Sequence, residues 1–246
     1  MSAPGTRPEG VEGEEQIARW VRGMFDSVAP RYDLMNRVLS ANVDRWWRKR
    51  TVQALSRHLN KKNAVVIDLC CGSGDLTLAL AKKRGGAAFG TDFSHAMLLQ
   101  AQRKSQSAGA HTPLFEADSL RLPLRDQSAD VLTVAFGFRN FSNYEKGLRE
   151  MHRVLKPGGV AAILELSTPP NALIRSGYRF YSDRVMPKVG AWLSSAGNAY
   201  KYLPESVKRF PGAPELAARM TAAGFTEVTF ERMTFGVAAL HLGVRN

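Results

Sequence analysis

Residues 64–75 read AVVIDLCCGSGD, a short apolar run that leads directly into a turn with two glycines. The run Ala64–Leu69 suits a strand buried on both faces, because its apolar residues follow one another with little polar alternation. Gly72 and Gly74 allow a tight turn and a close approach of the backbone to a ligand. The stretch 76–83 that follows is helical in pattern. This strand, turn and helix form the first part of a βαβ unit.

The alternation of strand and helix continues through the middle of the chain. Further strands are expected over residues 87–91, 114–117, 130–136 and 160–166, with helices over 96–107 and 144–155. Such alternation predicts an α/β fold, a doubly wound and mostly parallel sheet with helices on both faces.

Other elements are expected on both sides of this core. Helical patterns begin near Glu14, break at Pro30 and resume over 44–59. After the core come a helical region to about Ser195, a helix over 214–223 and two strands, 226–232 and 237–244, that would pair as a C-terminal antiparallel hairpin. We expect a disordered tail (1–13) and one domain (14–246), divided into an N-terminal helical cap (14–62), a ligand-binding core (63–166), capping helices (167–224) and C-terminal strands (225–246).

The charge of the chain is concentrated in the flanking segments. The 246 residues include 34 Lys and Arg against 22 Asp and Glu, a formal charge of +12, yet residues 63–130 hold seven basic and seven acidic side chains. Basic flanks around a neutral core favour an anionic partner, either nucleic acid or an anionic membrane surface. An ordinary basic surface would give the same composition.

No segment of the sequence is typical of a membrane span or a targeting signal. The longest apolar run, residues 131–138, is far shorter than the ~20 residues that cross a bilayer. The N-terminal segment has no apolar region of the kind that secretory signals carry, so we expect a cytoplasmic protein. Cys70 and Cys71 are neighbours, which excludes a disulfide framework and gives no zinc-ligand spacing, and we expect them to be packing residues.

Three acidic residues stand at the ends of three successive predicted strands. They are Asp68, Asp92 and Asp118. An acid about twenty residues beyond the glycine turn is placed to accept hydrogen bonds from ribose hydroxyls. Thr77 occupies the position where a dinucleotide-binding loop has its third glycine, which weakens a nicotinamide reading. Acidic strand ends favour S-adenosylmethionine, which carries a sulfonium, an ammonium and no phosphate; each acid alone could instead be a turn or cap residue.

The sequence at this point resembles the class I S-adenosylmethionine-dependent methyltransferases, and more closely the ubiquinone/menaquinone biosynthesis C-methyltransferases (UbiE/MenG). The resemblance lies in residues 25–36 (FDSVAPRYDLMN), 136–140 (FGFRN) and 235–243 (FGVAALHLG). It implies S-adenosylmethionine as cofactor. The residues that it places around the cofactor are Ser73, where relatives usually have Thr, and Asp92, Asp118 and Ser119. The glycines of the turn itself, Gly72 and Gly74, are also expected to bind the cofactor. A further contact after the fourth strand falls on Ala135, where only the backbone could serve.

The resemblance also implies methylation of a ring carbon of a reduced quinone, converting demethylmenaquinol to menaquinol. A benzoquinol of ubiquinone biosynthesis is the alternative substrate. Arg139 could stabilise the developing phenolate and Asn140 could fix a ring oxygen. Tyr32, Asp33 and His241 are the other catalytic candidates. His241 is the most natural base by type, although a structural strand histidine explains it equally well. Arg139 has the alternative of a salt-bridged structural arginine, and Asp33 that of a helix cap.

The expected partner is a polyprenyl quinol, whose tail requires an apolar path. Ile174, Tyr178, Tyr181 and Val185 fall near one helical face, with arginines and Lys188 between them. This suits a lid over a lipid-like ligand or a peripheral contact with an anionic membrane, and core packing would explain the aromatics as well. A homodimer stays open. The rival functions are an RNA methyltransferase, against which residues 137–140 lack the motifs of that chemistry, and a cofactor-binding scaffold without activity. We therefore expect no nucleic-acid partner.

Overall fold

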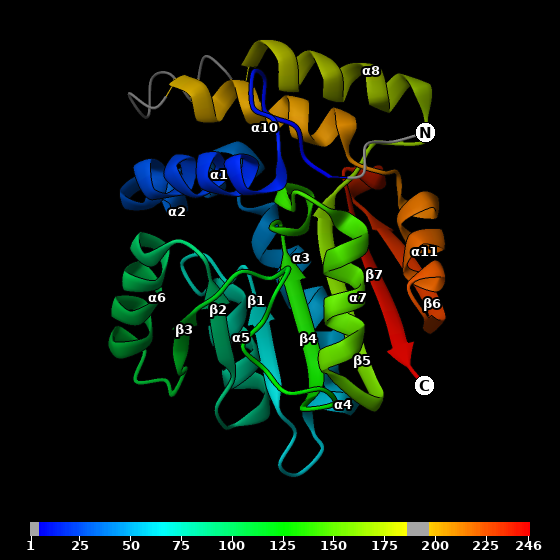
Figure 1. Cartoon of the computed structure of the whole chain (residues 1–246). Helices are drawn as coiled ribbons and strands as arrows, with labels where there is room; N and C mark the ends of the chain where they lie inside the picture. The colour runs from blue at the N-terminus through cyan, green and yellow to red at the C-terminus, as the bar shows by residue number, and fades with distance from the viewer. Residues whose placement is uncertain (1–4, 186–196) are drawn as a thin grey trace.

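The computed structural model describes residues 5–185 and 197–246, and its centre is a seven-stranded sheet (Figure 1). The strand order is β3-β2-β1-β4-β5-β7-β6, with parallel pairing from β3 to β5 and antiparallel pairing of β7 with both β5 and β6. The strands are β1 (Val66–Leu69), β2 (Phe89–Asp92), β3 (Leu114–Glu116), β4 (Ala129–Ala135), β5 (Leu155–Leu166), β6 (Phe225–Met233) and β7 (Ala238–Arg245). This confirms the predicted doubly wound sheet with a C-terminal antiparallel hairpin.

Helices cover both faces of the sheet and the end of it where the parallel strands finish. They are α1 (Glu14–Val28), η1 (Ala29–Arg31), α2 (Tyr32–Ser40), α3 (Val43–Ala54), α4 (Ser56–Leu59), α5 (Asp75–Arg84), α6 (His95–Ser107), η2 (Phe138–Asn140), α7 (Tyr144–Val154), α8 (Ala172–Phe180), the π-helical turn η3 (Tyr181–Val185), α10 (Gly197–Arg209), α11 (Ala213–Ala222) and η4 (Thr234–Gly236). In Figure 1, α1, α2, α8 and α10 lie together beyond the carboxyl ends of the parallel strands.

Two apolar cores sandwich the sheet because successive side chains of a strand point to opposite faces. Val66 and Val131 pack against α3, α4 and α5 on one face, whereas Ile67 and Leu132 pack against α7 and α11 on the other. All four residues of β1 are buried, as expected for the central strand of a doubly wound sheet.

Some expected boundaries differ from the structure. The helix expected over 44–59 is divided at Leu55 into α3 and α4. β5 begins at Leu155, earlier than expected, directly where α7 ends. α10 was not expected as a separate helix, and part of the helical region expected before Ser195 lies outside the described residues.

The expected disorder of residues 1–13 does not hold for residues 5–13, which the structure describes. Thr6 is buried, its N–H donates to the carbonyl of Phe141 (2.8 Å), and its hydroxyl contacts the Tyr202 hydroxyl (2.7 Å). Gly5 lies so close to the backbone of Ser142 that a Cβ there would approach the Ser142 oxygen to 2.0 Å. Backbone pairing and tight packing therefore hold a segment whose composition alone suggests a tail.

The order of the strands creates a crevice above β1 and β4. The chain moves from β1 outward to β2 and β3 and then returns to place β4 on the other side of β1, which is the reversal where doubly wound sheets bind ligands. Cys70 after β1 and Phe136 after β4 both have left-handed backbones (φ 48° and 61°), a strained conformation that clusters at functional sites. Gly137 must be glycine here, because a Cβ would lie 2.4 Å from the Cβ of Cys70.

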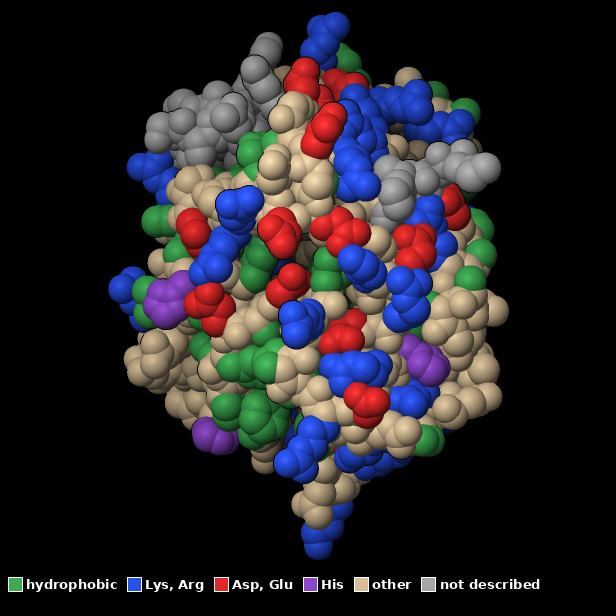
Figure 2. Space-filling model, viewed as in Figure 1, with side chains coloured by type: hydrophobic (Ala, Val, Ile, Leu, Met, Phe, Trp, Pro, Cys, Tyr) green, Lys and Arg blue, Asp and Glu red, His purple; other side chains and the backbone are tan. Residues whose placement is uncertain are grey.

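The surface charge is mixed on the face shown in Figure 2, where acidic side chains lie between the basic ones. The positive excess of the chain therefore does not form one continuous patch on that face. Within the described ranges 5–185 and 197–246, no helix has the length and apolar character needed to cross a membrane.

Candidate active site

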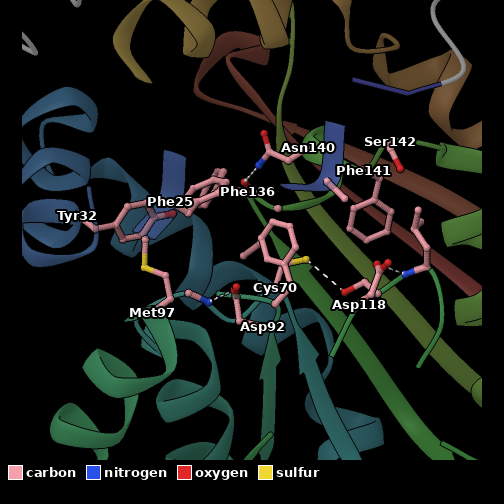
Figure 3. Close-up of a pocket in the computed structure, with 17 residues that line it drawn as sticks. Phe25, Tyr32, Cys70, Asp92, Met97, Asp118, Phe136, Asn140, Phe141 and Ser142 are labelled. Carbon is pink, nitrogen blue, oxygen red and sulfur yellow. Dashed lines mark hydrogen bonds between the residues drawn. The ribbon is translucent and has the colours of Figure 1, made fainter. Parts of the chain in front are cut away.

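The first of two adjoining pockets lies in the crevice above β1 and β4 (Figure 3). Its floor comes from the loops after β1, β2 and β4, and its side wall from α1 and α2 through Phe25 and Tyr32. The charged residues among those that line it are Asp92 and Asp118, and no lysine, arginine or histidine is among them. A phosphate-bearing ligand would be repelled by this lining, whereas the cationic, phosphate-free S-adenosylmethionine fits it.

Asp92, at the end of β2, is the best-held carboxylate of this pocket. It accepts hydrogen bonds from the N–H groups of Gly72 and Ser94, both at 2.9 Å. Burial raises its pKa to about 6, although these backbone hydrogen bonds act to lower it. Above that pH the residue is a fixed acceptor suited to ribose hydroxyls.

Of the other residues predicted to contact the cofactor, some line this pocket and others do not. Asp118 and Ser119 line the pocket; Asp118 accepts from the N–H of Leu120 (2.9 Å), and the Ser119 hydroxyl lies 3.4 Å from the sulfur of Cys70. Ser73, by contrast, is not part of the lining, because its hydroxyl donates to Asp33 (2.5 Å) and accepts from Lys104 (3.0 Å). Its side chain holds the loop instead of facing the pocket.

Of the two glycines of the loop, Gly72 lines the pocket, whereas Gly74 packs against α6. Gly72 has φ +54° and lines the pocket, where a Cβ would lie 3.6 Å from the Tyr32 ring. Gly74 has φ +84°, and a Cβ there would come within 3.0 Å of the Cβ of Ala101 on α6. Ala135, predicted as a backbone contact, also lines the pocket. Because Gly72 has no side chain, a ligand in the pocket can come close to the backbone of the loop.

Cys70 and Cys71 have the packing role that we expected. Burial raises the pKa of both thiols well above the usual value, and the nearby carboxylate of Asp92 adds to the effect. Neither is a thiolate near neutral pH, so neither is a nucleophile.

A second pocket of about 350 Å³ opens next to the first and shares Phe25, Tyr32 and Phe136 with it. Most of its walls are apolar and come from α1, α2 and α3, with Tyr178 and Tyr181 completing it from the side of α8. These two tyrosines are the ones that the sequence placed on a possible lid. Burial raises the pKa of Tyr178 to about 12, so its hydroxyl stays neutral. Val185 has no described side chain, and Lys188 lies outside the described residues.

Arg139 reaches this second pocket from η2, directly after β4, and is 7% exposed. One guanidinium nitrogen donates to Glu165 at 2.8 Å, and the backbone N–H of Arg139 donates to the other oxygen of the same carboxylate at 3.1 Å. Burial acts to lower the pKa of Arg139, but the charge and hydrogen bond of Glu165, together with Tyr32 and Tyr202, outweigh burial and raise the pKa. The Nε–H of Arg139 is buried without a hydrogen-bond partner among the described residues, which is a donor that a substrate oxygen can satisfy.

Asn140, next to Arg139, lies in the first pocket and in a chain of hydroxyl contacts. Its side-chain oxygen accepts from the Tyr202 hydroxyl (3.0 Å), which in turn contacts Thr6 (2.7 Å). The N-terminal segment and α10 thus fix the Asn140 amide between the two pockets. No local pattern of the sequence pointed to Thr6 or Tyr202 as parts of this site, and Glu165 was not predicted as one either.

Two predicted catalytic residues are not at the pockets. His241 lies in the middle of β7, 1% exposed, with Nε2 bonded to the carbonyl of Ala213 (2.9 Å), and burial lowers its pKa. It is a structural histidine that α11 covers, and the prediction of a base there was wrong. Asp33 forms an ion pair with Lys104 (2.6 Å) and accepts from Ser73. Burial acts to raise the pKa of Asp33, but these hydrogen bonds dominate and lower it, so it is an ionised anchor between α2 and the cofactor loop.

Comparison with known proteins agrees with this geometry. The family model described as "ubiE/COQ5 methyltransferase family" matches residues 11–245. A demethylmenaquinone methyltransferase of Thermus thermophilus is 47% identical over 90% of this chain and all of its own length. A ubiquinone/menaquinone biosynthesis C-methyltransferase UbiE of Geobacter sulfurreducens is 41% identical over 91% of this chain and 87% of its own.

Solved structures show the same fold. A methyltransferase from Thermotoga maritima described as S-adenosylmethionine-dependent superposes with a TM-score of 0.64 at 17% identity, covering 91% of this chain and 99% of the other. With the family match, this makes S-adenosylmethionine the cofactor. By its sequence match and its fold, the chain belongs to the ubiE/COQ5 methyltransferase family.

Proposed function

We propose that this enzyme transfers the methyl group of S-adenosylmethionine to a ring carbon of demethylmenaquinol, giving menaquinol. The observation that carries the proposal is the junction of the two pockets: an acid-lined pocket meets an apolar pocket of about 350 Å³ across Phe25, Tyr32 and Phe136. A quinol ring fits the apolar side, while the cofactor fits the acidic side. The names of relatives at 40–47% identity support the choice of substrate.

The chemistry needs negative charge on the quinol ring. Loss of a phenolic proton places charge on the ortho carbon, which attacks the methyl carbon as the bond from that carbon to sulfur breaks. The ring then loses its own proton to regain aromaticity, and the phenolate oxygen so formed takes up a proton, so that one proton is released to solvent overall. When bound, S-adenosylmethionine supplies the methyl group and the leaving sulfide.

Arg139 is the residue that we assign to the developing phenolate. It stays protonated at any working pH, so it acts as an electrostatic stabiliser and not as a base. Its unpartnered Nε–H supplies a donor, and Glu165 fixes the plane of the guanidinium. Asn140, held by Tyr202, can orient the second ring oxygen. Tyr32 lies at the junction, where burial raises the pKa of its hydroxyl and keeps it neutral.

The test is transfer of labelled methyl from S-adenosylmethionine to demethylmenaquinol, with a benzoquinol precursor and RNA as parallel acceptors. Arg139→Lys should lower kcat about 100-fold, as removal of a preorganised oxyanion donor does, with cofactor affinity within a few fold of the wild type. Arg50→Lys, at an exposed ion pair with Glu231, is the matched control. Labelling of RNA instead of the quinol, or equal turnover of the two variants, would refute the proposal.

The substrate also suggests where the enzyme works. A polyprenyl quinol resides in the bilayer, and the flanks of the chain are basic. We propose a cytoplasmic enzyme in transient contact with the inner face of an anionic membrane.

A further inference from the structure

Large hydrophobic side chains that remain exposed are concentrated around the second pocket. Seven such side chains occur among the described residues, and one of them, Leu99, lies on α6, which contributes no residue to the lining of that pocket. The other six lie on α2, α3, α8 and η4. We call these six the rim: Leu34 (52% exposed), Val38 (43%), Trp46 (51%), Leu173 (82%), Phe180 (65%) and Phe235 (77%).

Helical spacing places the rim residues beside the residues that line the pocket. On α2, Leu34 and Val38 are adjacent to the lining residues Met35 and Leu39. On α3, Trp46 lies one turn after the lining residue Val43.

The rim segments also contact one another. The indole N–H of Trp47 donates to Thr234 at 2.9 Å, joining α3 to η4. The hydroxyl of Tyr181, the first residue after α8, donates to the carbonyl of Leu39 on α2 at 2.8 Å. Gly236 packs against Pro170 just before α8. The four segments therefore surround the pocket as a connected border.

Phe235 is held outward by an unusual backbone. Thr234 and Phe235 are consecutive residues in the left-handed region, with φ of 47° and 56°. This costs conformational energy for residues with a side chain, most of all for a bulky one. The strained backbone holds Phe235 with 77% of its surface exposed, and an exposed aromatic ring adds nothing to the stability of the fold in water.

The four segments that carry the rim residues have an excess of positive charge, which favours an anionic partner. α2, α3, α8 and η4 together carry seven basic and two acidic residues. Both acids are paired, Asp33 with Lys104 and Asp44 with Arg48. Exposed basic side chains stand between the apolar ones, among them Arg37, Arg45, Lys49 and Arg179. Apolar groups interspersed with cations, without free anions, match an anionic phospholipid surface.

We propose that the rim docks on an anionic bilayer, with Phe235 as a wedge in the acyl-chain boundary, so that the substrate passes from the membrane into the second pocket without crossing water. This inference rests on the proposed function, because it assigns the membrane contact of that function to a particular surface.

The experiment measures co-sedimentation of the full chain with vesicles of phosphatidylglycerol and phosphatidylcholine, and with phosphatidylcholine alone. Phe235→Gly removes the ring and relieves the strained backbone, so the variant should fold at least as well as the wild type. We expect its affinity for the anionic vesicles to fall about tenfold, as loss of a buried aromatic side chain predicts. Leu99→Ser, which removes an exposed hydrophobic group away from the rim, should leave binding unchanged.

A second measurement compares turnover of a long-chain quinol in vesicles with turnover of a tail-less quinol in solution. The ratio of the two rates should fall in Phe235→Gly and stay constant in Leu99→Ser. Equal vesicle binding of the two variants, or binding that does not depend on anionic lipid, would overturn the proposal. So would a rim variant that converts a dimer to a monomer, because the rim would then be an interface between copies. Absence of methyl transfer by the wild type to either quinol would count against the proposed function instead.

Discussion

Replacing Glu165 with Gln should destabilise the protein strongly, because the change leaves the charge of Arg139 buried without its counter-ion. The side chains of the two residues are 8% and 1% exposed, and the carboxylate accepts from a guanidinium nitrogen (2.8 Å) and from the N–H groups of Arg139 (3.1 Å) and Leu166 (2.9 Å). Removing one partner of a buried pair costs about 3–5 kcal/mol. For a chain of this size, that loss lowers the unfolding midpoint by about 6 to 20 °C.

The assay is thermal and urea unfolding followed by far-ultraviolet circular dichroism without cofactor. Glu231→Gln is the matched control, because the Arg50–Glu231 pair has the same chemistry with both side chains 42% exposed. Exposed pairs are screened by solvent and contribute little, so the midpoint of Glu231→Gln should stay close to that of the wild type. Equal shifts in the two variants would refute the reasoning that burial makes the Arg139–Glu165 pair important.

Three further predictions concern the cofactor pocket. Burial raises the pKa of Asp92 to about 6, so the ionised fraction of this carboxyl group falls about tenfold from pH 7 to pH 5. The affinity for S-adenosylmethionine, measured by calorimetry, should fall in parallel. The Asp92→Asn variant should not show this pH dependence. Gly137→Ala should destabilise by about 1–3 kcal/mol through overpacking against Cys70, whereas Gly23→Ala, in open space on α1, should stabilise by about 0.5–1 kcal/mol; urea unfolding that gave both the same sign would contradict this. Iodoacetamide at pH 8 should leave Cys70 and Cys71 unmodified until the chain unfolds, since burial raises the pKa of both thiols, and rapid labelling of the native protein would disprove it.

The sequence was sufficient for the sheet and for the cofactor loop because both depend on local patterns. Short apolar runs before glycines specify the central strands, and the position of Asp92 follows from the length of one βα unit. Arg139 and Asn140 were predicted from their motif after the fourth strand. Their partners are on other elements, so no spacing within the chain could reveal them.

Local sequence patterns do not contain the contacts between distant elements that decide the role of some residues. The alternation of β7 makes His241 a strand residue, but only the packing of α11 decides that its ring meets the carbonyl of Ala213 and not the substrate. Glu165 differs in this respect, because it is a charged residue directly after the apolar run 160–164, and an acid buried there requires a partner. Thr6 had no such signal, because the composition around it is that of a tail.

The contact of Thr6 with Tyr202 has a practical consequence for recombinant work. A fusion partner or affinity tag at the N-terminus is covalently attached a few residues from the hydroxyl chain that ends at Asn140. The other end of the chain follows β7, which runs antiparallel to β5 and therefore finishes near the amino ends of the parallel strands, away from α1 and α2 (Figure 1). Purification handles and surface-immobilisation sites belong after Arg245, and kinetic constants from N-terminally tagged preparations should be compared with those of the cleaved protein.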